Sequence, residues 1–336
     1  EPAARVMNEP SSPAPGAPTA PASPAGPRAH VFHAGEIELQ RAAGSADRLA
    51  RVGPQVIRAR LPEQHREFFP LLPFVIVGSL DARGQPIASL LSGPPGFVTS
   101  PDPSQLRINA PIPRGDPLAQ NLAPGAPLAM LGIQPHTRRR NRANGRVAQH
   151  DPSGFTLAVE QSFGNCPKYI TQRELAYAGS TTAGCIGEPR VTSMLAPEQR
   201  ALLEQADTFF IASAHPDAAR APAAAHAAAH GLDVSHRGGP PGFVHFIDDA
   251  TFIIPDLRGN DFYNTLGNLR LQPLAGLLFI DFERGDLVGI EASAEAVVGD
   301  HPMAHPAASG RIVRFRVERV RALPGAAGVR VVAAGA

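Results

Sequence analysis

Two groups of basic residues in this chain have the types and spacing that hold anions. In the second half, Ser235 and Arg237 alternate on one face of an expected strand, with His236 between them and Gly238 and Gly239 after them. A guanidinium supplies positive charge, and glycine lets backbone amides approach an anion closely. Ser-His-Arg alone is no signal, so Ser235, His236, Arg237 and Gly238 are candidates for phosphate contact only together with evidence from the rest of the chain.

Three asparagine side chains follow this strand in the sequence, at a second place suited to an anion. Asn260, Asn264 and Asn268 surround an expected helix start, and helix N-termini favour phosphate groups. They are predicted to extend the same site.

The other basic group lies in the first half. Arg138, Arg139, Arg140 and Arg142 precede Asn144 in an expected strand at 137–147. A run of four arginines is usually a solvated sheet edge, so taken alone this group indicates no ligand.

The chain contains an internal duplication. SGPPGFV at 92–98 returns as GGPPGFV at 238–244, and PLAMLGI at 127–133 returns as PLAGLLFI at 273–280. Both matches have the same offset, since 239 − 93 and 273 − 127 are both 146. A register held over some thirty residues indicates two homologous modules joined in one chain.

The two copies differ where the basic residues lie. At this offset Leu91 stands opposite Arg237, whereas Ser89 matches Ser235. Of the four basic positions in the first module, only Arg284 is kept in the second. Each module has thus kept one half of a composite site, which predicts one complete site per chain.

The elements that must position these residues are mostly short strands. Residues 1–30 are rich in Pro and Ala and are predicted to be a disordered tail. Residues 31–190 form the first module with N-terminal helices, and residues 191–336 form the second. An Ala-rich insertion at 221–230 separates strands 208–214 and 232–237. Many short strands with few helices predict a mainly β fold with peripheral helices and one small barrel per module.

Composition limits the classes of partner. The 336 residues carry a formal net charge of +1, which gives no general attraction to nucleic acid or an anionic membrane. No apolar run approaches the roughly 20 residues of a membrane span. Two cysteines and the lack of an apolar secretion segment lead us to expect a cytoplasmic protein.

Four segments together resemble a known family. They are GLDVSHRGGPPGFV (231–244), RGNDFYNTLGNLRLQPLAGLLFIDF (258–282), RRRNRANG (138–145) and FGNCPKYI (163–170). They look like the pyridoxamine 5′-phosphate oxidase-like flavoproteins of the FMN-binding split-barrel class. The resemblance implies two tandem split β-barrels that form a pseudo-dimer within one chain, with FMN across their interface.

The family pattern implies roles for particular residues. Arg237 matches the lysine that ends the family's phosphate strand, and Arg139, Arg142 and Gly145 match its basic strand, which reaches the flavin from the partner barrel. Arg140, Asn144 and Lys168 are expected nearby. Together with the complementary losses, this resemblance makes the flavin interpretation of the arginine run better than a solvated edge.

The expected function is an FMN-dependent oxidoreductase that acts on a small molecule, with NAD(P)H or a separate reductase as electron donor. Two alternatives stay open, namely a flavin-binding protein without turnover and a haem-binding split barrel. The intrachain pseudo-dimer could act as a monomer, and a homodimer remains compatible.

Three further patterns contain side chains that can do chemistry. Cys166 lies near Lys168 and an expected helix start at Pro167, a setting that lowers a thiol pKa, but a small buried cysteine is the favoured interpretation. His226 and His230 have metal-ligand spacing without a third ligand, so no metal site is predicted. Ser235 with His236 lacks the nucleophile elbow and orienting acid of a hydrolase.

Overall fold

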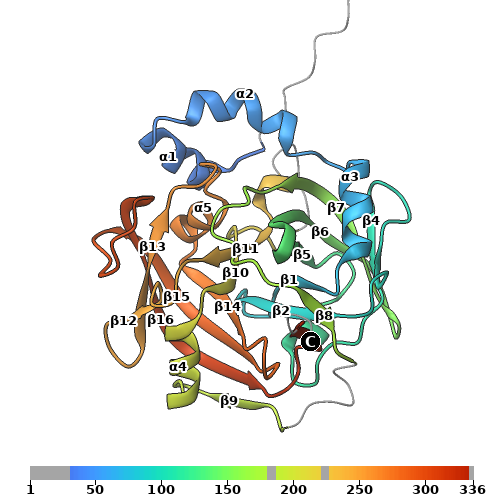
Figure 1. The fold of residues 1–336 in the computed structure, drawn as a ribbon. Helices are drawn as coiled ribbons and strands as arrows, with labels where there is room; N and C mark the ends of the chain where they lie inside the picture. Colours follow the sequence, from blue (N-terminus) through green and yellow to red (C-terminus); the bar gives the residue numbers. More distant parts are fainter. Residues whose placement is uncertain (1–30, 180–186, 221–226, 333–336) are drawn as a thin grey trace, which may run out of the picture.

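The computed structural model in Figure 1 describes residues 31–179, 187–220 and 227–332. The expected disordered tail at 1–30 lies outside this range, as do Cys185 and His226. The described chain is mainly β with a few peripheral helices, as predicted. Among the described residues, no helix combines the length and apolar character needed to cross a bilayer.

The first module forms one antiparallel sheet of seven strands in the order β2-β1-β5-β6-β7-β4-β3. Its strands are β1 (Phe74–Leu80), β2 (Pro86–Ser92), β3 (Val98–Thr99), β4 (Gln105–Ile108), β5 (Pro127–Gln134), β6 (Arg139–Asp151) and β7 (Gly154–Gly164). Two 3-10 turns, η2 (Pro117–Gln120) and η3 (Pro135–Thr137), lie before β5 and before β6.

The second module repeats this order as β11-β10-β14-β15-β16-β13-β12. Its strands are β10 (Thr208–Ala214), β11 (Leu232–Gly238), β12 (His245–Phe246), β13 (Thr251–Leu257), β14 (Leu274–Ile280), β15 (Leu287–Val298) and β16 (Ala308–Leu323), with η4 (Ala227–His230) between β10 and β11. Identical strand order in both halves agrees with the duplication inferred from the sequence.

Two pairings complete the sheets. β9 (Arg190–Thr192) joins the second sheet through β16, and β8 (Leu175–Tyr177) pairs with β17 (Val329–Val331). The predicted boundary between residues 190 and 191 therefore falls inside β9, a strand of the second sheet.

The two sheets pack against each other through equivalent strands. β2 of the first module lies against β14 of the second, and β11 of the second lies against β5 of the first. Such reciprocal contacts are typical of an isologous, twofold interface. Apolar side chains from both modules, including Phe74, Leu90, Phe210 and Leu232, form one buried cluster there.

Each module also has an apolar core of its own. In the first, Phe68, Phe155 and Leu157 are buried with the inner residues of β1, β5 and β7. In the second, Phe209 and Phe279 stack with ring centroids 4.7 Å apart. These three clusters hold the site strands, and a fourth, formed by Phe32, Leu49, Ile57, Phe163 and Phe262, joins the N-terminal helices to both modules.

Five α-helices lie around the sheets, namely α1 (Ala34–Ala42), α2 (Ala46–Val56), α3 (Glu63–Phe68), α4 (Pro197–Gln205) and α5 (Asn264–Leu271), with a 3-10 turn η1 (Phe69–Leu71) after α3. α1 packs against α5 of the second module (Figure 1). A Cβ on Gly35 would lie 2.3 Å from the carbonyl oxygen of Gly267, so the two helices meet closely only because both residues are glycine. The N-terminal segment assigned to the first module thus covers part of the second.

Candidate functional site

A cleft of about 140 Å³ lies where β6 of the first module meets β11 and the start of α5 in the second. It brings together nine of the residues expected from the sequence: Arg140, Arg142, Lys168, Ser235, His236, Arg237, Gly238, Asn260 and Asn264. Arg139, Asn144 and Asn268 do not line it. The two basic groups of the sequence therefore contribute to one cleft between the modules.

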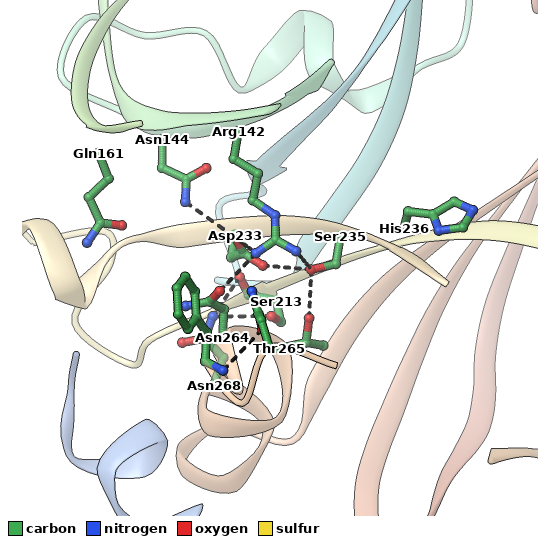
Figure 2. A network of polar contacts seen from close by, with 12 residues as sticks. Arg142, Asn144, Gln161, Ser213, Asp233, Ser235, His236, Asn264, Thr265 and Asn268 are labelled. Atoms are coloured by element: carbon green, nitrogen blue, oxygen red, sulfur yellow. Dashed lines mark hydrogen bonds and ion pairs between the residues drawn. The ribbon is translucent and has the colours of Figure 1, made fainter. Parts of the chain in front are cut away.

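Arg142 ties the two modules together at the base of this cleft (Figure 2). Its Nη1 donates to Asp233 Oδ1 at 3.0 Å and to Asn264 Oδ1 at 2.9 Å, and its Nη2 donates to Ser235 Oγ at 2.6 Å. Asn144 Nδ2 donates to the same Asp233 oxygen at 3.3 Å. All except Asn264 are buried. The charge of Arg142 is therefore compensated by a carboxylate of the protein itself.

Asp233 is the main residue that the sequence reasoning missed. It alternates with Ser235 and Arg237 in β11, so strand periodicity could have placed it on the same face. Its ion-pair partner could not be predicted from the sequence, because Arg142 lies 91 positions away in the chain.

Arg140 and Arg237 differ from Arg142 in having no carboxylate partner. Arg140 donates from Nε to the carbonyl of Cys166 at 2.9 Å and from Nη1 to His236 Nδ1 at 3.1 Å. Arg237 donates from Nη1 to the carbonyl of His236 at 3.1 Å. Neither forms an ion pair within the described part of the chain. Arg258 also lines the cleft without an ion pair in the described structure, but it is exposed, so Arg140 and Arg237 are the two partly buried guanidinium groups that face the cleft uncompensated.

The electrostatics of the cleft follow from this arrangement. Burial, and then the positive charges of Arg142 and Arg237, lower the pKa of Arg140 to about 9. Burial and then Arg142 likewise lower the pKa of Arg237. Both groups stay protonated at neutral pH. A bound anion would relieve this repulsion.

His236 lies between these cations as a neutral imidazole. Burial, and then the charges of Arg140 and Arg237, hold its pKa well below the ordinary value of 6.5. Because Nδ1 accepts from Arg140, the ring proton resides on Nε2. His236 therefore offers a donor that carries no charge.

Three cleft residues carry a buried polar atom without a hydrogen-bond partner among the described residues. These atoms are Arg142 Nε, Asn165 Oδ1 and His236 Nε2. Buried polar groups are nearly always paired with protein, water or ligand. Two donors and an acceptor, set beside two uncompensated cations, fit a polar anionic ligand.

Arg139 lies outside the cleft, whereas the sequence interpretation placed it at the flavin. Its Nη2 donates to the carbonyl of Gln64 at 3.1 Å, and its guanidinium lies 4.6 Å from the centroid of the Phe68 ring. Arg138 has a positive φ of 54° after η3, so β6 begins at Arg139. Arg139 and Arg142 are three positions apart and point to opposite faces of the strand. Arg140, two positions from Arg142, takes the place expected for Arg139.

Asn268 has a structural role, and Asn121 has the same role in the first module. Its Nδ2 donates to Ser213 Oγ at 3.2 Å, and Asn121 Nδ2 of the first module donates to Ser79 Oγ at 3.0 Å. Since the first module has this bond without the basic strand residue, the amide supports strand β10 and does not mark a phosphate site.

The segment at 163–170 lines the cleft through Asn165, Cys166, Lys168 and Tyr169. The chain after Pro167 forms a turn instead of the expected helix. A Cβ on Gly238 would lie 2.0 Å from the carbonyl oxygen of Tyr169. Gly238 is therefore required for this segment to approach β11.

The pseudo-equivalent position on the other side of the interface is closed. Its cavity is about 20 Å³ and is lined by apolar residues such as Leu287, by the acids Asp116 and Glu291, and by Arg321. Ser89, the counterpart of Ser235, donates to Asp116 Oδ1 at 2.6 Å. Burial raises the pKa of this carboxyl. Arg321 Nη2 lies 3.8 Å from Glu291 Oε1, so the charge of this arginine is already compensated, which favours one composite site per chain.

Glu36 of α1 extends the network towards the N-terminal helices. It is buried, and its carboxyl accepts from Asn264 Nδ2 at 2.6 Å and from the His33 backbone N–H at 2.7 Å. Burial raises the pKa of Glu36 from 4.5 to about 8. The carboxyl is therefore neutral at pH 7.

We expect Glu36 to make stability depend on pH. Its folded pKa lies above its unfolded pKa, so its contribution is complete below pH 4.5 and is lost as the pH rises towards 8. Relative to Glu36→Gln, the wild type should lose roughly 2 kcal/mol of unfolding free energy between about pH 6.5 and 8. Urea denaturation of both proteins across this range measures the difference. A pH-independent difference would show that Glu36 is ionised throughout.

Comparisons with known proteins give only weak similarity. No family model matches the chain, and no curated protein matches it. Among solved structures, HupZ of Group A Streptococcus is 17% identical, with a TM-score of 0.28, over 39% of this chain and 95% of that chain. A FAD-binding protein from Mesorhizobium loti is 12% identical, with a TM-score of 0.26, over 40% and 97%. HutZ, the haem storage protein of Vibrio cholerae, is 14% identical, with a TM-score of 0.23, over 37% and 89%.

Proposed function

We propose that the cleft between the modules binds FMN and that the protein is a flavin-dependent oxidoreductase of the tandem split-barrel type. The observation that carries the proposal is the pair Arg140 and Arg237, two cations from different modules that share one cleft without a carboxylate partner. A phosphate provides the compensating charge, and guanidinium groups bind phosphate through charge-assisted hydrogen bonds.

Each residue of the cleft would have a separate role. Arg237 and Arg140 would hold the phosphate, and Lys168, which is exposed at the rim, would meet an anionic substrate or the cofactor. His236 would donate from Nε2 without adding charge. Arg142 is a positioning residue, because its hydrogen bonds fix β11 and α5.

A bound flavin supplies the electron-transfer chemistry, and the protein supplies binding, orientation and electrostatics. The excess positive charge of the cleft favours an anionic form of any bound group. The electron donor would be NAD(P)H or a separate reductase, and the acceptor a small molecule. One site built from both halves of one chain makes a functional monomer sufficient.

The test is the absorption spectrum and flavin titration of the purified protein. We expect one FMN per chain, quenching of flavin fluorescence on binding, and bleaching by NADPH under anaerobic conditions. A flavin that no nicotinamide or reductase reduces would indicate a binding protein without turnover. A Soret band in place of flavin absorption would indicate haem. Two flavins per chain would contradict the single composite site.

A further inference from the structure

Three residues with metal-binding side chains meet at the connection between β10 and β11. His215 is the first residue after β10 and Asp217 is the third, and His230 ends η4, two positions before the start of β11. One ligand atom from each lies within 4.8 Å of the others. This is the one such group of histidine, cysteine and acidic residues found in the parts of the chain that the structure describes. The sequence had paired His230 with His226, which lies outside those parts.

The fold does not require this cluster. The equivalent connection in the first module is a tight turn, in which the Asp81 N–H donates to the carbonyl of Gln85 at 3.0 Å. The second module has instead the longer Ala- and His-rich segment that ends at His230. The three side chains therefore belong to an addition specific to one module.

The imidazoles are held close together. The rings of His215 and His230 stack with centroids 4.0 Å apart, and the His33 ring meets His215 edge-on at 5.1 Å. One ligand atom of each histidine is thus held within 4.8 Å of a carboxylate oxygen of Asp217.

The donor set selects a class of cation. Two imidazole nitrogens with one carboxylate suit Zn²⁺ and its transition-metal neighbours, whereas Mg²⁺ and Ca²⁺ prefer oxygen ligands. We propose that His215, Asp217 and His230 bind one divalent transition-metal ion, with water completing the coordination. This site is separate from the flavin cleft and does not depend on it.

The geometry sets the expected affinity. A metal lies in the plane of each imidazole that binds it, so one of the two parallel rings must rotate. The Asp217 backbone N–H donates to His215 Nδ1 at 3.1 Å, and this bond is lost if Nδ1 becomes the ligand. Both costs reduce affinity, and we expect a dissociation constant on the order of micromolar.

Calorimetric titration with ZnCl₂ tests the site on full-length protein purified without a polyhistidine tag. We expect one Zn²⁺ per chain at this affinity, weakened at least about tenfold in His215→Ala and in His230→Ala. Zn²⁺ should also raise the thermal midpoint of the wild type but not of these variants. Asp217→Asn, which keeps the shape of the side chain, should weaken binding with folding intact.

His245→Ala is the matched control. His245 and His301 form another ring pair, 5.9 Å apart, outside the cluster. This variant should bind Zn²⁺ as the wild type does. The proposal is overturned if the wild type binds no Zn²⁺ in the micromolar range, or if His215→Ala and His230→Ala bind it as tightly as His245→Ala.

Discussion

Replacing Arg142 with alanine is expected to lower the free energy of unfolding by about 3–5 kcal/mol. The substitution leaves Asp233 buried without its ion-pair partner and removes hydrogen bonds to Ser235 and Asn264. Arg142 and Asp233 are only 7% and 6% exposed, so solvent cannot replace the lost charge. Urea denaturation measured by circular dichroism gives the change.

Arg314→Ala provides the control for this prediction. Arg314 pairs with Glu295 at 2.9 Å, but the two side chains are 45% and 56% exposed, and such surface pairs contribute about 0–1 kcal/mol. The double variant Arg142→Met, Asp233→Leu removes both buried charges and should recover much of the loss. If Arg142→Ala were as stable as Arg314→Ala, the buried ion pair would not hold the modules together.

The expected fold followed from local patterns in the sequence. Apolar runs and alternation placed β1, β5, β10 and β14 within a few residues, because strand periodicity depends on neighbouring side chains. The constant offset between the repeats predicted that both sheets would have the same order. These features need no knowledge of which residues meet at long range.

The errors arose where the outcome depends on distant contacts. Arg139 was placed with Arg142 by family pattern, but the αL residue Arg138 sets the start of β6, and Arg139 lies over Phe68 instead. Glu36 reaches Asn264 across 228 positions, and its buried carboxyl had no sequence signal. The type of residue was predictable at these places, whereas its partner was not.

The same distinction explains the histidine cluster. The sequence pattern pointed to His226 because it lies four positions before His230. The structure instead places His215 and Asp217 beside His230, since β10 and β11 pair antiparallel and bring the two ends of the connection together. Spacing along the chain could not reveal a partner that only strand pairing supplies.

Arg237→Ala is expected to weaken FMN binding by about ten- to a hundredfold. A charge-assisted hydrogen bond contributes roughly 1.5–3 kcal/mol, which corresponds to this change in affinity. Arg237 has no carboxylate partner among the described residues, so its removal leaves no buried acid unpaired and the fold should persist. Arg140→Ala should weaken binding by a similar factor, since it reaches the same cleft from the first module. Flavin fluorescence quenching gives the dissociation constants, with circular dichroism as a check on folding.

Arg284→Ala separates this specific effect from a general loss of positive charge. Arg284 is the cation that the second module keeps at this offset; it lies in the turn between β14 and β15, where it is 73% exposed and pairs with Asp286 at 3.3 Å. Its removal changes the net charge as Arg237→Ala does, but it should leave FMN affinity unchanged, because Arg284 does not line the cleft between the modules. Equal losses in both variants would indicate that flavin binding follows net charge or two equivalent sites. Unchanged affinity in Arg237→Ala, with Arg140→Ala also unaffected, would place the phosphate elsewhere, since the other uncompensated arginine that lines this cleft in the described structure, Arg258, is exposed.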